Sequence, residues 1–362
     1  MLSYKKTYTL PFRFFVPTYI DDFLEKKSII KCGIKYIKRN LYILLKRQKS
    51  LEISNISENH LDILWINLSA PSLGDSLMDL SSRKLLHKKN IDLFTDKKNA
   101  HIFSNDVYFS AVYVDIKDVI NKKKYDLVII DSYSSRSVLI KSKIAALVPY
   151  VSMYGYFNGP EVNRVLFSFH QMNRLLGYIN TEKDINIKAK SSMTISMHDQ
   201  KLVNGLKLPK EFITIVLGGD WSYRTYNNWC EVIERLFCLD HNIQIALVGS
   251  ENAKNDEKKI FEKLSSYKLF SFVAKYSFTQ TAQILSKSSL VFCCDGGLMH
   301  AANSLGVKVI PLLAKLDASM QLTESCKSFP LFDLLDVNNI LVEDIIQKYS
   351  EAASFDHNHL LS

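Results

Sequence analysis

Short apolar runs separated by helical stretches are the feature that most constrains the fold of this chain. Strands that are buried on both faces lose the alternation of polar and apolar residues, and the helices between them supply the crossovers that parallel strands require. We expect such strands at 61–68, 91–95, 111–114, 127–130, 151–154, 212–217, 243–248, 270–273, 290–294 and 307–313. The pattern predicts an α/β protein with two doubly wound, Rossmann-like domains, which would place a cleft between the carboxyl ends of their strands.

The length of the chain agrees with two domains. At 362 residues it exceeds one ordinary domain of about 150 residues, and 47% hydrophobic with 23% charged residues is typical of a globular protein. Residues 180–196 are polar, rich in lysine and without periodicity, so we expect a linker there. The predicted divisions are an N-terminal extension at 1–60, a first domain at 61–180, a linker at 181–200, a second domain at 201–340 and a C-terminal helix or tail at 341–362.

The net charge of +9 is concentrated at the N-terminus. Residues 1–50 hold twelve Lys or Arg against three acids, and the rest of the chain is neutral overall. Apolar residues recur in this arm at helical spacing: Ile30, Ile34, Ile37, Leu41, Leu44 and Leu45. A basic amphipathic helix suits an anionic membrane surface or a nucleic acid backbone, and it also suits a helix packed on the protein's own core with a solvated basic face. Nucleic acid is the weaker expectation, because no recognised nucleic-acid module follows.

The cysteines and the hydropathy bear on cofactors and location. The six cysteines show no CxxC spacing, so we expect reduced thiols rather than zinc, a redox pair or disulfides. No segment reaches the roughly 18 uninterrupted apolar residues of a transmembrane helix, and Met1 to Tyr19 has no long apolar stretch typical of a signal peptide. These features predict a cytoplasmic protein.

The run Asp295-Gly296-Gly297-Leu298-Met299-His300 lies where an expected strand leads into an expected helix. The first turn of a helix has unpaired N–H donors and the positive end of the dipole, so such junctions bind phosphates. Glycine lets a ligand approach the backbone closely, and a histidine one turn later adds a hydrogen bond or a charge. The alternative is a tight turn with a capping Asp.

Two further turns follow expected strands. Gly74-Asp75 comes after the opening strand, where Asp75 either caps a helix or serves as a general base within reach of a substrate hydroxyl. Gly218-Gly219-Asp220-Trp221-Ser222-Tyr223-Arg224 comes after the first strand of the second domain. Its glycines can expose backbone N–H groups, and the forked donors of Arg224 suit a diphosphate.

Together these turns resemble the heptosyltransferases, the family 9 glycosyltransferases of the GT-B fold. The resemblance spans roughly residues 61 to 315, and its most specific part is Asp295 to His300. The other matching residues are Ser69 to Asp75, the strand Asp126 to Ile129, Gly218 to Arg224, Leu247 to Ser250, Ala301-Ala302 and Leu305-Gly306. The first 60 residues have no counterpart in the usual pattern of the family.

The resemblance implies a role for each matching residue. Asp75 takes the position of the catalytic base that deprotonates the acceptor hydroxyl, and Arg224 falls where the family has a basic residue near the donor phosphates. The donor-binding residues so implied are Gly74, Gly218, Gly219, Arg224, Asp295, Gly296, Gly297, Leu298 and His300. Gly296 departs from the usual Ser or Thr, and Gly218-Gly219-Asp220 lacks the hydroxyl residues often found there. Both departures remove hydroxyl groups that would donate hydrogen bonds to the phosphates, and they leave the identity of the nucleotide sugar open. Backbone N–H groups can replace these hydroxyls.

The implied activity is an inverting, metal-independent transfer of heptose from ADP-heptose to a lipopolysaccharide or lipooligosaccharide core. The first domain would bind the acceptor and the second the nucleotide sugar. No Asp-x-Asp pair follows a predicted strand, so no divalent ion and no cofactor beyond the donor are expected. The expected partners are the nucleotide sugar, an anionic glycolipid acceptor and, through residues 1–50, the surface of the inner membrane, with no nucleic acid. The alternatives are a GT-B enzyme with another nucleotide sugar and a non-catalytic relative. A dinucleotide oxidoreductase is disfavoured, since no G-x-G-x-x-G follows the first strand.

Overall fold

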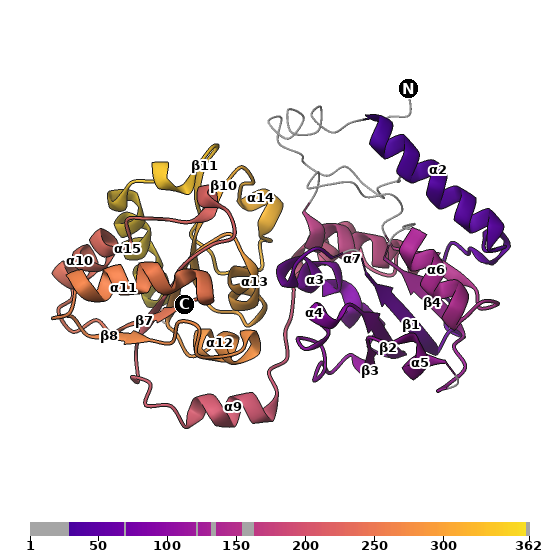
Figure 1. Cartoon of the computed structure of the whole chain (residues 1–362), viewed down its shortest axis with the longest axis horizontal. Coiled ribbons are helices and arrows are strands. Elements are labelled where there is room, and N and C mark those ends of the chain that lie inside the picture. The colour runs from indigo at the N-terminus through magenta and orange to yellow at the C-terminus, as the bar shows by residue number, and fades with distance from the viewer. Residues whose placement is uncertain (1–28, 69, 121, 132–134, 154–162, 360–362) are drawn as a thin grey trace. The chain divides into compact units, whose positions relative to one another are not determined.

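The chain divides into two compact units, Met1–Thr194 and Ile195–Ser362 (Figure 1). The computed structural model describes residues 29–68, 70–120, 122–131, 135–153 and 163–359. Each unit is an α/β layer structure with one parallel sheet, which confirms the predicted fold class of two doubly wound domains. In the described residues no helix is long and apolar enough to span a bilayer.

The first unit contains five strands among its described residues. The strands are β1 (Asp62–Asn67), β2 (Asn90–Thr95), β3 (Phe109–Tyr113), β4 (Leu127–Ile130) and β5 (Tyr150–Ser152). The helices are α2 (Ile29–Leu45), α3 (Leu73–Asp79), α4 (Lys97–Ala100), α5 (Ile116–Val119), α6 (Ser135–Ile144), α7 (Arg164–Leu175) and α8 (Glu182–Lys188), with 3-10 turns η2 (Lys49–Leu51) and η3 (Ser81–Leu86).

The strand order of the first sheet is β3-β2-β1-β4-β5, with every pairing parallel. The order reverses between β1 and β4, which is the switch point where doubly wound sheets bind ligands outside the carboxyl ends of their strands. On one face, Val119 of α5 and Val138 of α6 share a core with the strands, and Ile43 of α2 joins them. On the other, Met78 of α3 packs with α7 and α8. Asp75 follows β1 and therefore lies beside this switch point.

The second unit contains six strands among its described residues. They are β6 (Ile213–Val216), β7 (Ile245–Val248), β8 (Leu269–Ser271), β9 (Leu290–Cys294), β10 (Val309–Ala314) and β11 (Leu331–Asp333). The helices are α9 (Met197–Asn204), α10 (Trp229–Leu239), α11 (Lys254–Lys263), α12 (Phe278–Leu285), α13 (Gly297–Ser304), α14 (Ala318–Gln321) and α15 (Val342–His359), with 3-10 turns η4 (Ser222–Arg224), η5 (Glu251–Ala253) and η6 (Val337–Asn339).

The second sheet has the order β11-β10-β9-β6-β7-β8, again with parallel pairings throughout. In order of appearance this is 3-2-1-4-5-6 read from β8, the Rossmann arrangement, with the switch point between β6 and β9. One core joins the sheet to α10, α11 and α15, and a second core on the opposite face joins it to α12 and α13 (Figure 1). The helices on both faces explain why the strands are apolar without alternation.

Local structure differs from the sequence-based expectation in the segment before the unit boundary. Residues 180–196 are not aperiodic throughout, because α8 occupies Glu182–Lys188. Thr181 and Asp184 form a reciprocal capping box at its start, in which each side chain accepts a hydrogen bond from the other's backbone N–H. Capping thus stabilises a helix that could not be identified from its polar sequence. The units divide after Thr194.

The predicted N-terminal extension lies partly outside the described residues, since the description begins at residue 29. Its described part belongs to the first unit. After α2, Ile53 donates a backbone hydrogen bond to Tyr150 O (2.9 Å) and Ile56 donates one to Leu175 O (2.7 Å). These bonds fix the segment after α2 along β5 and the end of α7.

Candidate functional site

The second unit gathers the predicted donor residues at its switch point. The turn with Gly218 and Arg224 follows β6, and the turn with Asp295 and His300 follows β9. Because β6 and β9 are neighbouring parallel strands, their carboxyl ends lie side by side. The structure therefore brings Arg224, Asp295 and His300 together.

Asp295 lies between the guanidinium of Arg224 and the imidazole of His300. Its Oδ2 is 3.0 Å from Nη1 of Arg224, and its Oδ1 is 3.8 Å from Nε2 of His300. The carboxylate and the imidazole are almost fully buried, and the guanidinium is about a quarter exposed. Arg224 Nε and Asp295 Oδ2 are buried without an aligned hydrogen-bond partner among the described residues. A buried guanidinium N–H without an aligned partner at a switch point is typical of a polar ligand site.

The electrostatics of the cluster favour an ionised Asp295. Burial by itself raises the pKa of this carboxyl group, but the polar contact with His300 and the charge of Arg224 outweigh burial, and the pKa is lowered from its ordinary value. Asp295 is therefore a carboxylate that holds Arg224 and His300 in position.

The N-terminus of α13 follows directly. Gly296 is the N-cap residue, and Gly297 and Leu298 form the first turn, all three partly exposed. The first N–H groups of a helix have no partner within it and point outward at the positive end of the dipole. Gly296 has an extended backbone with φ of 175°, and a Cβ at this position meets no atom within 4 Å. The glycine is therefore not required by local packing, and a serine fits here.

Unlike Gly296, Gly218 and Gly219 are explained by their local structure. Gly218 has φ of +77°, and a Cβ there lies 2.9 Å from Oδ1 of Asn252. At Gly219 a Cβ lies 2.6 Å from Oγ1 of Thr225. Backbone conformation and close packing thus require both glycines. Their contact with a donor stays a prediction.

Lys315 belongs to this edge of the sheet and was not identified from the sequence. It follows β10, the neighbour of β9, and its Nζ lies 3.5 Å from the centroid of the Tyr223 ring. The guanidinium of Arg224 lies 5.3 Å from the same centroid, so the Tyr223 ring makes cation–π contacts with both side chains. Lys315 has φ of +65°, a conformation that is uncommon for residues other than glycine and often found at functional sites. The position of a lysine immediately after a strand was the feature of the sequence that could have identified Lys315.

In the first unit, Asp75 lies in the first turn of α3. The hydroxyl of Ser72, the N-cap residue, accepts from the Asp75 backbone N–H (3.2 Å) and donates to Asp75 Oδ2 (2.6 Å). The carboxylate therefore lies in the first turn of α3, where Ser72 and not Asp75 is the N-cap residue, and it is still partly exposed. Gly74 is buried beside it in the same turn. A carboxylate has about four lone-pair sites, so the contacts with Ser72 and Arg164 leave room for a substrate hydroxyl.

Arg164 links Asp75 to a second acid that was not identified from the sequence. Its Nε and Nη2 donate to the two oxygens of Asp79 (2.8 and 2.6 Å), and its Nη1 lies 3.6 Å from Asp75 Oδ1. Asp79 lies four residues after Asp75, on the same side of α3. This spacing from Asp75 could have identified Asp79 from the sequence. Arg164 comes from the start of α7, and no local pattern connects it to α3.

Asp79 has a strongly altered environment. Burial raises its pKa to about 6, the nearby Asp75 and Asp131 add to the rise, and Arg164 opposes it. Two acids one helical turn apart repel each other, so Arg164 offsets the repulsion and orients Asp75. The arrangement is typical of a carboxylate held for proton transfer by a second carboxylate and a cation.

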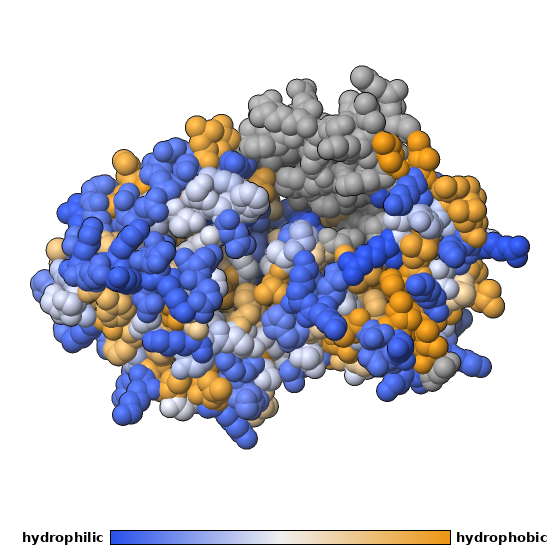
Figure 2. Space-filling view, in the orientation of Figure 1, coloured by the Kyte–Doolittle hydropathy of each residue, from blue (hydrophilic) through white to orange (hydrophobic). Residues whose placement is uncertain are grey.

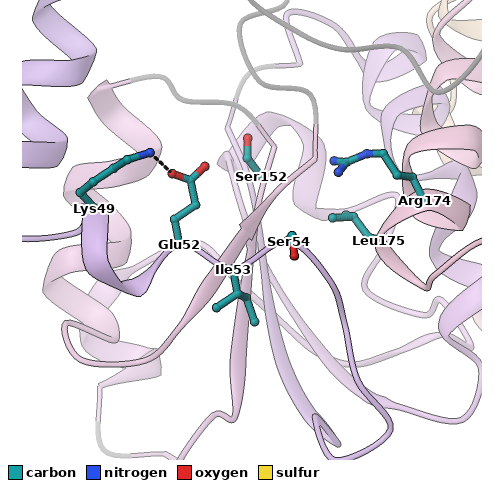
Figure 3. Close-up of a pocket in the computed structure, with 7 residues that line it drawn as sticks. All are labelled: Lys49, Glu52, Ile53, Ser54, Ser152, Arg174 and Leu175. Carbon is teal, nitrogen blue, oxygen red and sulfur yellow. Dashed lines mark hydrogen bonds and ion pairs between the residues drawn. The ribbon is translucent and has the colours of Figure 1, made fainter.

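A separate cavity of about 410 Å³ lies in the first unit. Its lining residues are Lys49, Glu52, Ile53, Ser54, Ser152, Arg174 and Leu175. Figure 3 shows Ser152 between Glu52, which is paired with Lys49, and the guanidinium of Arg174. Ser152 ends β5, so the cavity adjoins the carboxyl edge of the sheet, the edge to which Asp75 also belongs. It contains none of the predicted site residues and offers donors to a small polar or anionic group.

The two units thus carry different chemistry. The second offers cations and helix N–H groups suited to a diphosphate, and the first offers a restrained carboxylate suited to accept a proton. No group of three or more His, Cys, Asp or Glu that is suited to a metal occurs in the described part of the chain.

Comparisons with known proteins identify the family and the fold of the chain. Residues 120–324 match the sequence profile of glycosyltransferase family 9 (heptosyltransferase). A comparison with curated proteins found no match. Among solved structures, a family 9 glycosyl transferase from Veillonella parvula has a TM-score of 0.68 at 13% identity, covering 83% of this chain and 99% of that one.

Two Escherichia coli structures are also similar. ADP-heptose lps heptosyltransferase II has a TM-score of 0.65 at 15% identity, covering 82% of this chain and 100% of its own. Heptosyltransferase WaaC with ADP has a TM-score of 0.56 at 16% identity, covering 80% and 99%. At these identities the structural similarity establishes the fold.

Proposed function

The chain belongs to glycosyltransferase family 9, and from that premise we propose that it transfers heptose from ADP-heptose to a lipopolysaccharide or lipooligosaccharide core. It is a glycosyltransferase by its family and fold. Two similar structures are named for heptosyltransferases, one of them with ADP bound, which supports the choice of donor.

The observation that carries the proposal is the cluster of Arg224, Asp295 and His300 at the switch point of the second unit. We assign the diphosphate of the donor to Arg224 and to the N-terminus of α13, where Gly296, Gly297 and Leu298 allow close approach of the backbone. Asp295 and His300 hold Arg224 and the start of the helix in place. Gly218 and Gly219 shape the adjoining turn, and Lys315 adds a second cation.

In the proposed reaction Asp75 removes the proton from the acceptor hydroxyl. The oxygen forms a bond to the anomeric carbon, the bond from that carbon to the diphosphate breaks, and ADP leaves with the electron pair. Attack opposite the leaving group inverts the configuration. The charge that develops on ADP is stabilised by Arg224, Lys315 and the helix dipole, so the proposal assigns no step to a metal ion.

The acceptor that we propose is an anionic glycolipid at the cytoplasmic face of the inner membrane. The cavity lies in the unit that carries Asp75. Lys49 is paired there with Glu52, and the guanidinium of Arg174 beside the hydroxyl of Ser152 suits an anionic sugar. Gly74, next to Asp75, is buried in α3 and supports the position of the base.

A transfer assay tests the proposal. Purified protein is incubated with a heptose-deficient core acceptor and, in separate reactions, with ADP-heptose, UDP-glucose or GDP-mannose, and the products are identified by mass spectrometry. We expect one heptose to be added from ADP-heptose alone. Transfer from another nucleotide sugar would identify a GT-B enzyme of different donor specificity, in keeping with the missing hydroxyl at Gly296. Absence of transfer from every donor would indicate a non-catalytic relative.

A further inference from the structure

Helix α2 presents an unpartnered apolar surface in the first unit. Ile34, Ile37, Leu41, Leu44 and Leu45, here called the α2 stripe, are each between 51% and 68% exposed. Their spacing of three, four and seven residues places them along one side of the helix. Figure 2 shows hydrophobic residues gathered where Figure 1 places α2. Contiguous exposed apolar patches of this kind mark interaction sites.

The stripe is not the side by which α2 joins the protein. Ile43 is buried in the core shared with α5 and α6, and Arg39 is buried beside it. Both lie on the opposite side of the helix from Leu41 and Leu45. The predicted packing on the protein's own core therefore occupies one side of α2, and a second apolar side is left over.

The charge of this segment indicates what covers the stripe. Residues 29–51 contain seven Lys or Arg and no acid. Lys38 is exposed within the helix, and Lys46 and Arg47 are exposed just after it. A lipid bilayer with anionic headgroups offers both an apolar layer and negative charge, whereas a nucleic acid offers the charge without an apolar surface.

We propose that α2 docks the protein on the surface of an anionic lipid bilayer. The helix of 17 residues lies in the plane of the membrane over about 25 Å. The α2 stripe enters the boundary between headgroups and acyl chains, and Lys38, Lys46 and Arg47 contact the headgroups. The proposal depends on neither the donor nor the acceptor of the transfer reaction.

Vesicle flotation of the full-length protein tests the proposal, without donor or acceptor present. The vesicles contain either phosphatidylglycerol with phosphatidylethanolamine or phosphatidylcholine alone. A stripe variant carries Ile37→Gln, Leu41→Gln and Leu45→Gln, and a charge variant carries Lys38→Gln and Lys46→Gln. The control carries Val107→Gln and Leu147→Gln, which are 75% and 87% exposed and lie outside α2. Circular dichroism checks that each variant is folded.

We expect the wild type to bind anionic vesicles, to bind less at high salt and to bind phosphatidylcholine weakly. The stripe variant lowers the partition coefficient about tenfold or more, and the charge variant lowers it about fivefold for each charge removed. The control binds as the wild type does. Transfer to a water-soluble acceptor fragment is unchanged in the stripe variant, because the stripe takes no part in the reaction.

Equal binding by the wild type and the stripe variant would overturn the proposal, as would a wild type that binds no vesicle. A wild type that is dimeric in light scattering, with a stripe variant that is monomeric and binds lipid normally, would assign the stripe to a second copy of the chain instead. None of these results depends on whether heptose is transferred.

Discussion

Gly296 occupies the position where the resemblance to family 9 implies a Ser or Thr. Its extended backbone and the empty space around its Cβ position show that a serine fits without rearrangement. We expect Gly296→Ser to fold normally and to be stabilised by a few tenths of a kcal/mol through better capping of α13. The added hydroxyl donates to the donor diphosphate, so the Kd for ADP falls about threefold to tenfold. Calorimetric titration with ADP measures the effect, and an unchanged or weaker affinity would place the phosphates elsewhere.

The ion pair of Arg224 and Asp295 gives a pH-dependent prediction. The pKa of Asp295 is lowered in the folded protein, so its contribution to stability is present above the ordinary pKa of 3.8 and is lost as the pH falls through the lowered value. Arg224→Gln removes one cause of the lowering and is expected to cost about 2 kcal/mol at neutral pH. The difference from the wild type shrinks at low pH, where Asp295 is protonated.

Urea unfolding at neutral pH and at a pH below the lowered pKa of Asp295 measures this difference. Arg235→Gln is the control, because Arg235 pairs with Glu343 at an exposed site and its loss costs at most about 1 kcal/mol at neutral pH. A penalty for Arg224→Gln that is constant across the pH range would show that the pair does not set the ionisation of Asp295.

Lys315 is expected to bind the leaving group. Lys315→Met preserves the hydrophobic stem over Tyr223 and removes the charge. It should raise the KM for the donor about tenfold, with the melting temperature unchanged. Lys287→Met is the control, since Lys287 is exposed and lies just before β9, at the opposite edge of the sheet. Equal donor KM values for the two variants would remove Lys315 from the site.

Residues next to strand ends were predictable, and residues contributed by distant segments were not. Asp295 and His300 share one short run, and both this run and Arg224 follow strands that the sequence predicted, while the structure shows that these two strands are neighbours. Arg164 reaches Asp79 across 85 positions of sequence, and no periodicity encodes such a contact. Lys315 adjoins the site only because β10 pairs with β9.

At the scale of elements, the start of α7 and the helix α3 act together through Arg164. Arg164→Gln leaves Asp79 buried without its cation, and we expect a loss of roughly 3 kcal/mol in the free energy of unfolding. The double variant Arg164→Gln with Asp79→Asn recovers part of that loss, because the uncompensated charge is also removed. Chemical denaturation of the two single variants and the double variant measures the coupling.

Substitution of Arg164 is also expected to change the kinetics of transfer, because Arg164 positions Asp75. We expect Arg164→Gln to lower kcat about tenfold with an unchanged donor KM, since Asp75 loses a contact that orients it. Arg164→Lys restores kcat only in part, because a lysine cannot reproduce the forked contact with Asp79. Arg136→Gln, which breaks an exposed pair with Asp96, is the control. A kcat for Arg164→Gln equal to that of the control would limit Arg164 to a structural role.

Most of the elements themselves were predictable. Buried strands in parallel sheets are apolar throughout, so their existence and order of appearance could be read from the sequence, as β6, β7 and β9 show. The short edge strand β11 was missed, because Leu331–Asp333 is only partly buried and carries no apolar run. The helix α8 was missed because side-chain capping, not an apolar face, defines its start.

At the scale of the whole molecule, two doubly wound units divide the proposed reaction. In this proposal the first unit carries Asp75, which is assigned as the proton acceptor, and the second carries the groups that are assigned to the diphosphate. The resemblance to family 9 implied this division, and the structure adds that each unit has its own switch point, between β1 and β4 in the first and between β6 and β9 in the second. The basic extension was predicted as a helix, but only the structure shows that α2 keeps a second apolar side exposed.

A single-turnover assay with ADP-heptose and a heptose-deficient core acceptor tests most directly whether Asp75 is the base of a heptosyltransferase. It compares the wild type with Asp75→Asn and with Asp118→Asn, an exposed acid of the same unit. We predict that the wild type and Asp118→Asn add one heptose at the same rate. Asp75→Asn should be slower by about 10² to 10⁴ while it binds ADP-heptose normally. Transfer by Asp75→Asn at the wild-type rate, or a wild type that binds ADP-heptose and forms no heptosylated product, would contradict the account.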